Sequence, residues 1–133
     1  MQLKKGVKHL LAEANAEIET IGAAEAIKLR DDADVVIVDL RDPRERDRDG
    51  YIPGAFHAPR GMLEFWIDPE SPYHKEIFAS GKRFIFHCAS GGRSALAAKA
   101  AQDMGLPKVC HFAGGFKAWV EAGGPVECKE EKN

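Results

Sequence analysis

The stretch FIFHCASGGRS, residues 84–94, joins an apolar run to a helical pattern through a short loop that contains two glycines. Its first part, Phe84–His87, is typical of a buried β-strand. The pattern that starts at Arg93 and continues to Met104 places apolar residues on one face, as an amphipathic helix does. Cys88 therefore lies at the carboxyl end of a predicted strand, which is where open α/β sheets bind their ligands.

The loop between this strand and this helix is suited to an anion. Backbone N–H groups of the loop and of the first helical turn have no partner within the helix, and Gly91 and Gly92 can adopt positive φ values that turn such groups toward one point. The helix dipole adds to the attraction for negative charge. A thiol at a helix N-terminus ionises more readily, its pKa falling from about 8.5 to about 3.5–7.5. A lone cysteine after a strand can also be an inert buried thiol, but the glycines and Arg93 favour a thiolate nucleophile at Cys88.

Strands and helices alternate on both sides of this segment. Val35–Val38 is a β-branched run of the kind found in strands buried on both faces, and Lys108–Phe112 and Ala55–His57 are further candidate strands. The predicted helices are Ala23–Leu29, Met62–Ile67, His74–Ala79, Arg93–Met104 and Phe116–Glu121. We therefore predict an α/β domain of three layers, with a central, mostly parallel sheet and helices on both faces.

The length of 133 residues fits one domain, and 44% hydrophobic residues are enough to form its core. Residues 1–20 have apolar side chains at helical spacing and are predicted to be an amphipathic helical extension. Residues 21–124 hold the alternating strands and helices. Residues 125–133 are predicted to be a polar tail.

Charge and cysteine content exclude several classes of protein. With 19 basic and 21 acidic residues, the net charge of −2 argues against nucleic acid as a partner. No apolar run reaches the roughly 20 residues of a membrane span, and we expect neither a membrane partner nor a secretory signal. Three cysteines are an odd and sparse set for a disulfide-stabilised secreted domain, so we predict a reducing, cytoplasmic location.

No cysteine or histidine pair has the spacing of a zinc site. Cys110 and His111 are adjacent, but neighbouring residues of a strand point to opposite faces of the sheet. We expect neither a metal nor a cofactor.

Four short motifs in a fixed order resemble those of the rhodanese family. They comprise an Asp-x-Arg followed by a Glu, a Gly-x-Ile-Pro-Gly-Ala element in which Tyr51 replaces the usual histidine, a six-residue active-site loop and a closing Gly-Gly-Phe-x-Ala-Trp. In this chain they are Val38–Glu45, Gly50–Ala55, Cys88–Arg93 and Gly114–Trp119. The resemblance covers nearly all of the chain beyond the first twenty residues and implies a rhodanese-like fold for residues 21–124.

The family resemblance implies a sulfurtransferase that moves a sulfane sulfur from thiosulfate or a related donor to a thiophilic acceptor such as cyanide. The sulfur is carried as a persulfide on Cys88, which makes this an enzyme that works by covalent catalysis. The residues expected to bind the substrate are Ala89, Ser90, Gly91, Gly92 and Arg93. The guanidinium of Arg93 is suited to an anionic donor, although an ion pair at the start of the helix is the alternative. The expected partners are a small-molecule donor and acceptor, with a sulfur-carrier protein as a further candidate, and the oligomeric state is left open.

Two other functions stay open at this stage. Cysteine phosphatases and arsenate reductases have a similar signature, but with five residues between the cysteine and the arginine, whereas Cys88 and Arg93 are separated by four. The shorter loop makes a smaller cradle, sized for one sulfur rather than for a tetrahedral phosphoryl group. A non-catalytic binding or sulfur-relay module is the second alternative, although inactive relatives typically lack the loop cysteine.

Further polar residues of the motifs are expected to have structural roles. We predict that Asp39 and Arg41 form an ion pair that ties the first motif to the active-site loop, with direct contact to substrate as the alternative. Glu45 is expected to be structural too, and Trp119 is expected to anchor the last helix.

The remaining candidates lie outside the loop. His87 should face away from the Cys88 sulfur, and Cys110 should be a small core residue. Cys128 is expected to be an exposed free thiol. Arg60 and Trp66 either border the pocket or cover the surface.

Overall fold

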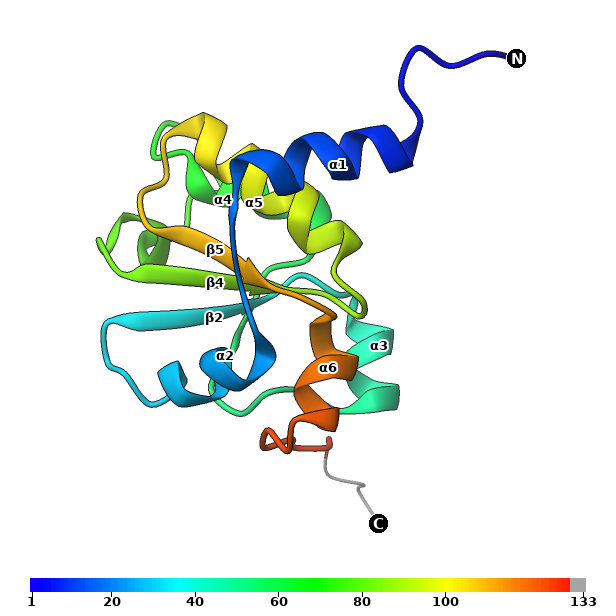
Figure 1. Cartoon of the computed structure of the whole chain (residues 1–133). Coiled ribbons are helices and arrows are strands. Elements are labelled where there is room, and N and C mark those ends of the chain that lie inside the picture. The colour runs from blue at the N-terminus through cyan, green and yellow to red at the C-terminus, as the bar shows by residue number, and fades with distance from the viewer. Residues whose placement is uncertain (130–133) are drawn as a thin grey trace.

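Five strands form a single parallel sheet in the order β1-β5-β4-β2-β3 (Figure 1). The strands are β1 (Glu19–Ile21), β2 (Val35–Asp39), β3 (Phe56–His57), β4 (Arg83–His87) and β5 (Val109–Phe112). The computed structural model describes residues 1–129, so the end of the predicted tail, residues 130–133, lies outside the described residues. The predicted α/β fold with a central parallel sheet is confirmed.

Helices cover both faces of the sheet, with α1, α4 and α5 on one side and α2 and α6 on the other (Figure 1). The α-helices are α1 (Val7–Glu17), α2 (Ala23–Leu29), α3 (Pro43–Asp49), α4 (Leu63–Ile67), α5 (Gly92–Met104) and α6 (Gly115–Glu121). Two 3-10 turns, η1 (Arg60–Met62) and η2 (Glu76–Ala79), lie in the long middle segment.

The strands are buried on both faces because each face packs against its own layer of helices. Val38 and Phe86 point toward α5, whereas their neighbours Ile37 and Ile85 point toward α2 and α6, where Trp119 is completely buried. This arrangement explains the continuous apolar runs of β2 and β4. It also places β4, and the loop that follows it, at the centre of the sheet.

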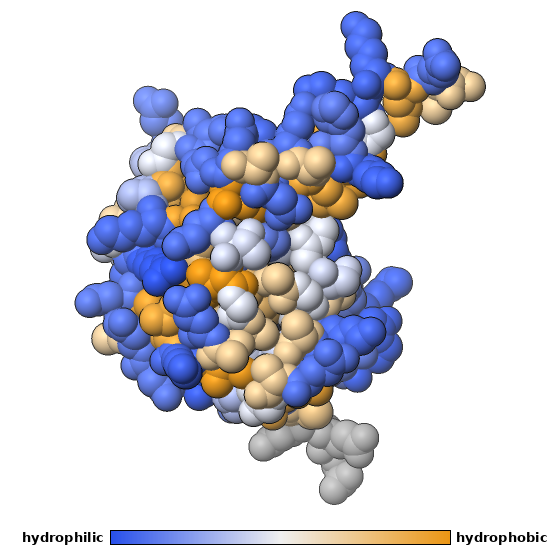
Figure 2. All heavy atoms as spheres, viewed as in Figure 1, coloured by the Kyte–Doolittle hydropathy of each residue, from blue (hydrophilic) through white to orange (hydrophobic). Residues whose placement is uncertain are grey.

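The amino-terminal segment is less helical than expected. The helix predicted over residues 1–20 is confined to Val7–Glu17, and Glu19–Ile21 forms the edge strand β1, paired with β5. Three residues are too few for an alternating pattern to be visible, so only pairing with β5 defines this strand. Figure 2 shows hydrophobic residues gathered on the middle of this face of the molecule, where β1 runs between α1 and α2.

The helix α3 is not among the predicted helices because its sequence, PRERDRD, has no apolar residue and so no amphipathic pattern. Its start is nevertheless well defined. The Asp42 side chain accepts hydrogen bonds from the N–H groups of Arg44 and Glu45, the Glu45 carboxylate accepts one from the N–H of Asp42, and Pro43 occupies the first helical position. Capping residues therefore define this helix, and it carries Glu45 to the active-site loop.

Candidate active site

Cys88 directly follows β4, and only 1% of its surface is exposed. Two backbone N–H groups donate to its sulfur, that of Gly91 at 3.1 Å and that of Ser94 at 3.4 Å. Of the two loop glycines, Gly91 is the one with a positive φ, 109°, whereas Gly92 begins α5. A residue with a Cβ rarely adopts this conformation, which here leads the chain from the loop into α5. The sulfur thus lies at the amino end of α5, where negative charge is favoured.

The amino end of α6 packs against the Cys88 loop. Phe116 and Lys117 donate their N–H groups to the carbonyl oxygens of Cys88 and Ala89, at 2.8 and 3.3 Å. Gly115 has a φ of 59°, and a Cβ at this position would lie 2.6 Å from the Cys88 carbonyl oxygen. Only glycine lets the amino end of α6 lie this close to the Cys88 loop. The closing Gly-Gly motif therefore has a physical role in holding the loop.

Arg93 forms a two-point ion pair with Glu45 of α3. Its two terminal nitrogens lie 2.6 and 2.8 Å from the two carboxylate oxygens. The hydrogen bonds with Arg93 outweigh the effect of burial and lower the pKa of Glu45 below its usual value. The side chain of Arg93 is still 42% exposed. The ion pair was the alternative to donor binding, and in this structure it fixes the guanidinium at the edge of the loop.

The other residues of the predicted substrate-binding loop form its rim. Ser90 is exposed, and Ala89, Gly91 and Gly92 are partly buried. The loop therefore has a buried sulfur at its base and a polar, exposed edge. A role in substrate binding for these residues stays a prediction.

Asp39 and Arg41 form the predicted buried ion pair. Arg41 donates from Nε and Nη2 to the two carboxylate oxygens, at 3.1 and 2.9 Å, and from Nη2 to the carbonyl oxygen of Gly50. Its guanidinium lies 4.1 Å from the centre of the Phe116 ring. Burial, which raises the pKa, is the largest single influence on Asp39, but the hydrogen bonds from Arg41 and the attraction to nearby positive charge together lower the pKa of the carboxyl. The pair thus connects the first motif to α6, which in turn contacts the loop.

His87 is completely buried on the α6 side of the sheet, where its ring stacks on Phe112. Burial lowers its pKa to about 4, against the attraction of Asp39, so the ring is neutral at neutral pH. Its Nδ1 contacts the carbonyl oxygen of Cys88 and not the sulfur. His87 thus faces away from the Cys88 sulfur, as predicted.

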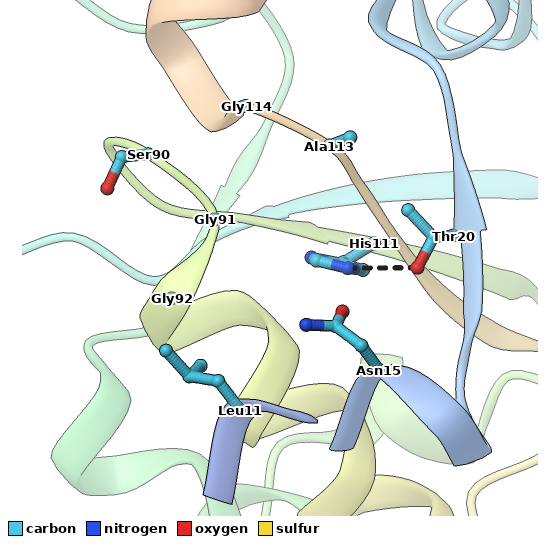
Figure 3. A pocket seen from close by; sticks show the side chains of 9 residues that line it. All are labelled: Leu11, Asn15, Thr20, Ser90, Gly91, Gly92, His111, Ala113 and Gly114. Atoms are coloured by element: carbon cyan, nitrogen blue, oxygen red, sulfur yellow. Dashed lines mark hydrogen bonds between the residues drawn. The ribbon is translucent and has the colours of Figure 1, made fainter. Parts of the chain in front are cut away.

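A second set of polar side chains approaches the sulfur from the α1 side, and the sequence analysis did not identify it. The Ser94 hydroxyl lies 3.6 Å from Cys88 Sγ and 2.9 Å from His111 Nδ1. His111 Nε2 in turn lies 3.1 Å from the Thr20 hydroxyl (Figure 3). The position of Ser94, directly after Arg93 in the first turn of α5, could have drawn attention to it. His111 and Thr20 are 91 residues apart and had no such signal.

The remaining candidates lie elsewhere in the fold. Cys110 is completely buried in β5, and burial raises its pKa to about 11, whereas Cys128 is exposed. Arg60 forms an ion pair with Glu64, and Trp66 packs against the apolar core on the α5 side of the sheet. Trp66 thus covers this core.

Among residues 1–129, no cluster of three or more His, Cys, Asp or Glu side chains has the arrangement of a metal site. Within the same range, no helix has the length and apolar character needed to cross a membrane. A cytoplasmic location and the absence of nucleic-acid partners stay predictions.

Comparison with known proteins places these features in a family. The family model of the Rhodanese-like domain matches residues 22–122. The chain is 31% identical over 104 residues to thiosulfate sulfurtransferase/rhodanese-like domain-containing protein 3 of Mus musculus, covering 74% of this chain and 64% of the mouse protein. It is 35% identical over 99 residues to the thiosulfate:glutathione sulfurtransferase of Saccharomyces cerevisiae, covering 70% of each.

A solved structure from Rhodopseudomonas palustris is similar over almost the whole chain. It superimposes with a TM-score of 0.92, is 60% identical, and covers 96% of this chain and 98% of its own. That protein is of unknown function and is described as a possible tyrosine phosphatase. The match includes the amino-terminal segment that the family model leaves out.

Proposed function

The chain belongs to the rhodanese-like domain family, and on this premise we propose that it is a sulfurtransferase whose sulfur carrier is Cys88. It moves a sulfane sulfur from thiosulfate or a related donor to a thiophilic acceptor such as cyanide. The observation that carries this proposal is the Cys88 sulfur at the focus of the Gly91 and Ser94 N–H groups. Preorganised N–H donors stabilise negative charge at the place where it resides during the reaction.

In the first step, the Cys88 thiolate attacks the outer sulfur of thiosulfate. A bond forms between the two sulfurs, the sulfur–sulfonate bond breaks, and sulfite leaves with the electron pair. The product is a persulfide whose terminal sulfur carries the negative charge. The exposed rim of Ser90 and Arg93 is where the donor binds, and the guanidinium of Arg93 attracts its sulfonate group.

In the second step, a nucleophilic acceptor attacks the terminal sulfur of the persulfide. The new bond to the acceptor forms as the persulfide bond breaks, and its electron pair returns to Cys88 as a thiolate. Cyanide takes the sulfur as thiocyanate, and a thiol such as glutathione takes it as a persulfide. The yeast relative, which is a thiosulfate:glutathione sulfurtransferase, supports a small thiol as acceptor. A sulfur-carrier protein is a further acceptor of the same chemistry.

A phosphatase is the second candidate because the Rhodopseudomonas palustris protein, whose function is unknown, is described as a possible tyrosine phosphatase. A phosphoryl group in transfer presents three equatorial oxygens that need donors. The loop here has four residues between Cys88 and Arg93, directs two N–H groups at a single sulfur and holds Arg93 in the ion pair with Glu45. These features favour sulfur transfer over phosphoryl transfer.

The two functions are separated by one set of assays. We expect the wild-type protein to form thiocyanate from thiosulfate and cyanide, and Cys88→Ala to reduce this to background. Cys128→Ala is the matched control, because it removes an exposed thiol outside the loop and should leave the rate unchanged. The same assay with glutathione in place of cyanide, in which the release of sulfite is measured, tests whether a thiol is an acceptor.

The same proteins should be assayed for hydrolysis of an aryl phosphate ester, and we expect no hydrolysis. Hydrolysis of the ester without turnover of thiosulfate would establish the phosphatase instead. If neither substrate reacts and no sulfur is retained on the protein, the chain is a non-catalytic binding module.

A further inference from the structure

A pocket of about 230 Å³ lies beside the Cys88 loop, between the loop and the amino-terminal segment (Figure 3). The strand β5 and the loop provide one side of it, and α1 and β1 provide the other. The lining residues are Leu11, Asn15, Thr20, Ser90, Gly91, Gly92, His111, Ala113 and Gly114. The first three precede residue 22, where the match to the family begins. The amino-terminal segment therefore completes a pocket that the matched part of the chain leaves open.

A continuous line of hydrogen bonds connects the buried sulfur to this pocket. It passes from Cys88 Sγ to the Ser94 hydroxyl, then to His111 Nδ1, and from His111 Nε2 to the Thr20 hydroxyl. Ser94 is completely buried and His111 is 3% exposed, whereas Thr20 is exposed. The parallel pairing of β1 with β5 places Thr20 directly beside His111, so both side chains lie on the same face of the sheet.

We propose that Ser94 and His111 conduct the Cys88 thiol proton to this pocket and thereby generate the reactive thiolate. The proposal rests on the proposed function, because sulfur can be taken up only by the ionised thiol. Ser94 contacts the sulfur itself. His111 acts through Ser94 and is a positioning residue that also receives the proton, and Thr20 holds its far nitrogen.

The proton balance of this step is simple. The Sγ–H bond of Cys88 breaks and its proton passes to the Ser94 oxygen, which in turn gives up its own proton to His111 Nδ1. The products are a thiolate and an imidazolium. The thiolate then accepts a hydrogen bond from the Ser94 hydroxyl in addition to the N–H groups of Gly91 and Ser94. The imidazolium donates from Nδ1 to Ser94 and from Nε2 to Thr20, and the pocket lets solvent exchange its proton.

The surroundings of His111 suit a base that is neutral at rest. The side chains that face it are Ser94 from α5, Thr20 from β1 and Asn15 from α1, none of which carries a charge (Figure 3). Burial lowers the pKa of His111, and no charged group of the described residues contributes to that shift. The ring is therefore unprotonated at neutral pH and free to accept a proton at Nδ1.

Two further ionisable side chains, His87 and Arg93, lie near Cys88. His87 is neutral, as shown above, and points to the opposite face of the sheet. The pKa of Arg93 is raised, first by its hydrogen bonds with Glu45 and in part by attraction to Cys88. Arg93 thus favours the thiolate but cannot accept its proton, which leaves the Ser94–His111 route as the path for the proton.

The rate of alkylation of Cys88 by iodoacetamide, followed against pH by peptide mass spectrometry, tests the relay without any sulfur donor. All proteins should carry Cys128→Ser, so that the exposed thiol does not compete. We expect Ser94→Ala to move the midpoint of the Cys88 profile upward by about one pH unit, the size of a lost hydrogen bond to a charged group. His111→Gln should move it in the same direction by less, because His111 acts on the sulfur through Ser94. His9→Gln, which changes an exposed histidine of α1, is the matched control and should leave the midpoint in place.

Thr20→Val extends the test to a variant at an exposed site, where folding is less at risk. It removes the partner of His111 Nε2 and should give a smaller shift in the same direction. NMR titration of His111 is the reciprocal measurement. Because the thiolate stabilises the imidazolium, His111 should titrate at lower pH in Cys88→Ala than in the wild type.

An unchanged Cys88 midpoint in folded Ser94→Ala and His111→Gln overturns the relay, even if thiocyanate is still formed. If either variant is unfolded by circular dichroism, an unchanged midpoint in Thr20→Val overturns it. The converse result, shifted midpoints in a protein that transfers no sulfur, would support the relay while the proposed function fails. The relay is thus tested by the midpoint of Cys88 alkylation, and the proposed function is tested separately by sulfur transfer.

Discussion

Cys110 lies within β5, and Cys88 directly follows β4, the strand paired with β5. The two cysteines are equally buried, with exposed fractions of 0% and 1%, yet their surroundings differ completely. Cys88 follows the last residue of β4, where two N–H groups of the next loop and helix donate to its sulfur. Cys110 lies within β5, where the backbone groups around it pair along the sheet. Arg83 approaches its sulfur to 3.8 Å, but burial dominates and raises its pKa to about 11.

Burial and a nearby cation are common to both cysteines, so they do not account for the proposed reactivity of Cys88. What distinguishes Cys88 is its position at the carboxyl end of a central strand, where the chain leaves the sheet and unpaired N–H groups become available. The α6 contact through Gly115 then holds that loop in place. Substitutions can remove these features one at a time.

The largest effect is expected for Gly115→Ala. The new Cβ would lie 2.6 Å from the Cys88 carbonyl oxygen and would displace the loop, which should reduce sulfur transfer about 100-fold, as misplacement of about 1 Å can do. The positive φ adds about 1–2 kcal/mol of destabilisation. Steady-state kinetics and urea unfolding measure the two effects.

Gly81→Ala is the matched control for this variant. Gly81 also has a positive φ, 75°, but a Cβ there would meet no atom within 4 Å. It should lose similar stability and keep its activity. An equal loss of activity in both variants would show that the contact between Gly115 and the Cys88 loop does not determine the rate of sulfur transfer.

A smaller effect is expected when the cation beside each thiol is removed. Arg93→Ala should raise the KM for thiosulfate about tenfold, because a charged hydrogen bond to the donor is lost. Arg83→Ala removes the cation beside Cys110 and should leave the KM unchanged. A similar KM in the two variants would mean that Arg93 serves only its ion pair with Glu45.

The third prediction concerns pH and stability. The pKa of Cys110 is raised from 9.0 to about 11 in the folded state, so the unfolded chain loses this proton first as pH rises. The contribution to stability is therefore complete below pH 9 and is lost between pH 9 and about 11, by about 1 kcal/mol at pH 10. Urea unfolding at pH 8 and pH 10 measures it. Cys110→Ala, which cannot titrate, should show a smaller decrease, and an identical decrease would contradict the assignment.

The smallest effect on activity is expected for Cys110→Ala itself. The substitution removes one buried sulfur and should cost about 1 kcal/mol of stability, with the rate of sulfur transfer unchanged. The assay is thiocyanate formation at neutral pH. A large loss of activity would mean that Cys110 takes part in the reaction.

Much of this architecture could be predicted from the sequence because the central strands carry a local signal. Val35–Val38 and Phe84–His87 are runs typical of strands that are covered on both faces, and the glycines after Cys88 mark the loop. The parallel sheet and the position of Cys88 followed from these segments. The short elements β1 and α3 have no apolar pattern and could not be predicted in this way.

The partners in two polar contacts of the site could not be predicted because each contact joins distant segments. Glu45 and Arg93 are 48 residues apart, and Thr20 and His111 are 91 residues apart. Each pair meets only because a capped helix or an edge strand brings one partner into place. Arg93 was predicted to bind the donor, with an ion pair at the start of the helix as the alternative, and only the fold shows that the partner in this ion pair is Glu45.

The most direct test of Cys88 as sulfur carrier is peptide mass spectrometry of the protein after treatment with thiosulfate alone. All three cysteines should be followed in the same digest. We predict the mass of one additional sulfur atom on the peptide that contains Cys88, and its loss when cyanide is added. Sulfur on the Cys110 or Cys128 peptide, or on none of the three, would contradict this account.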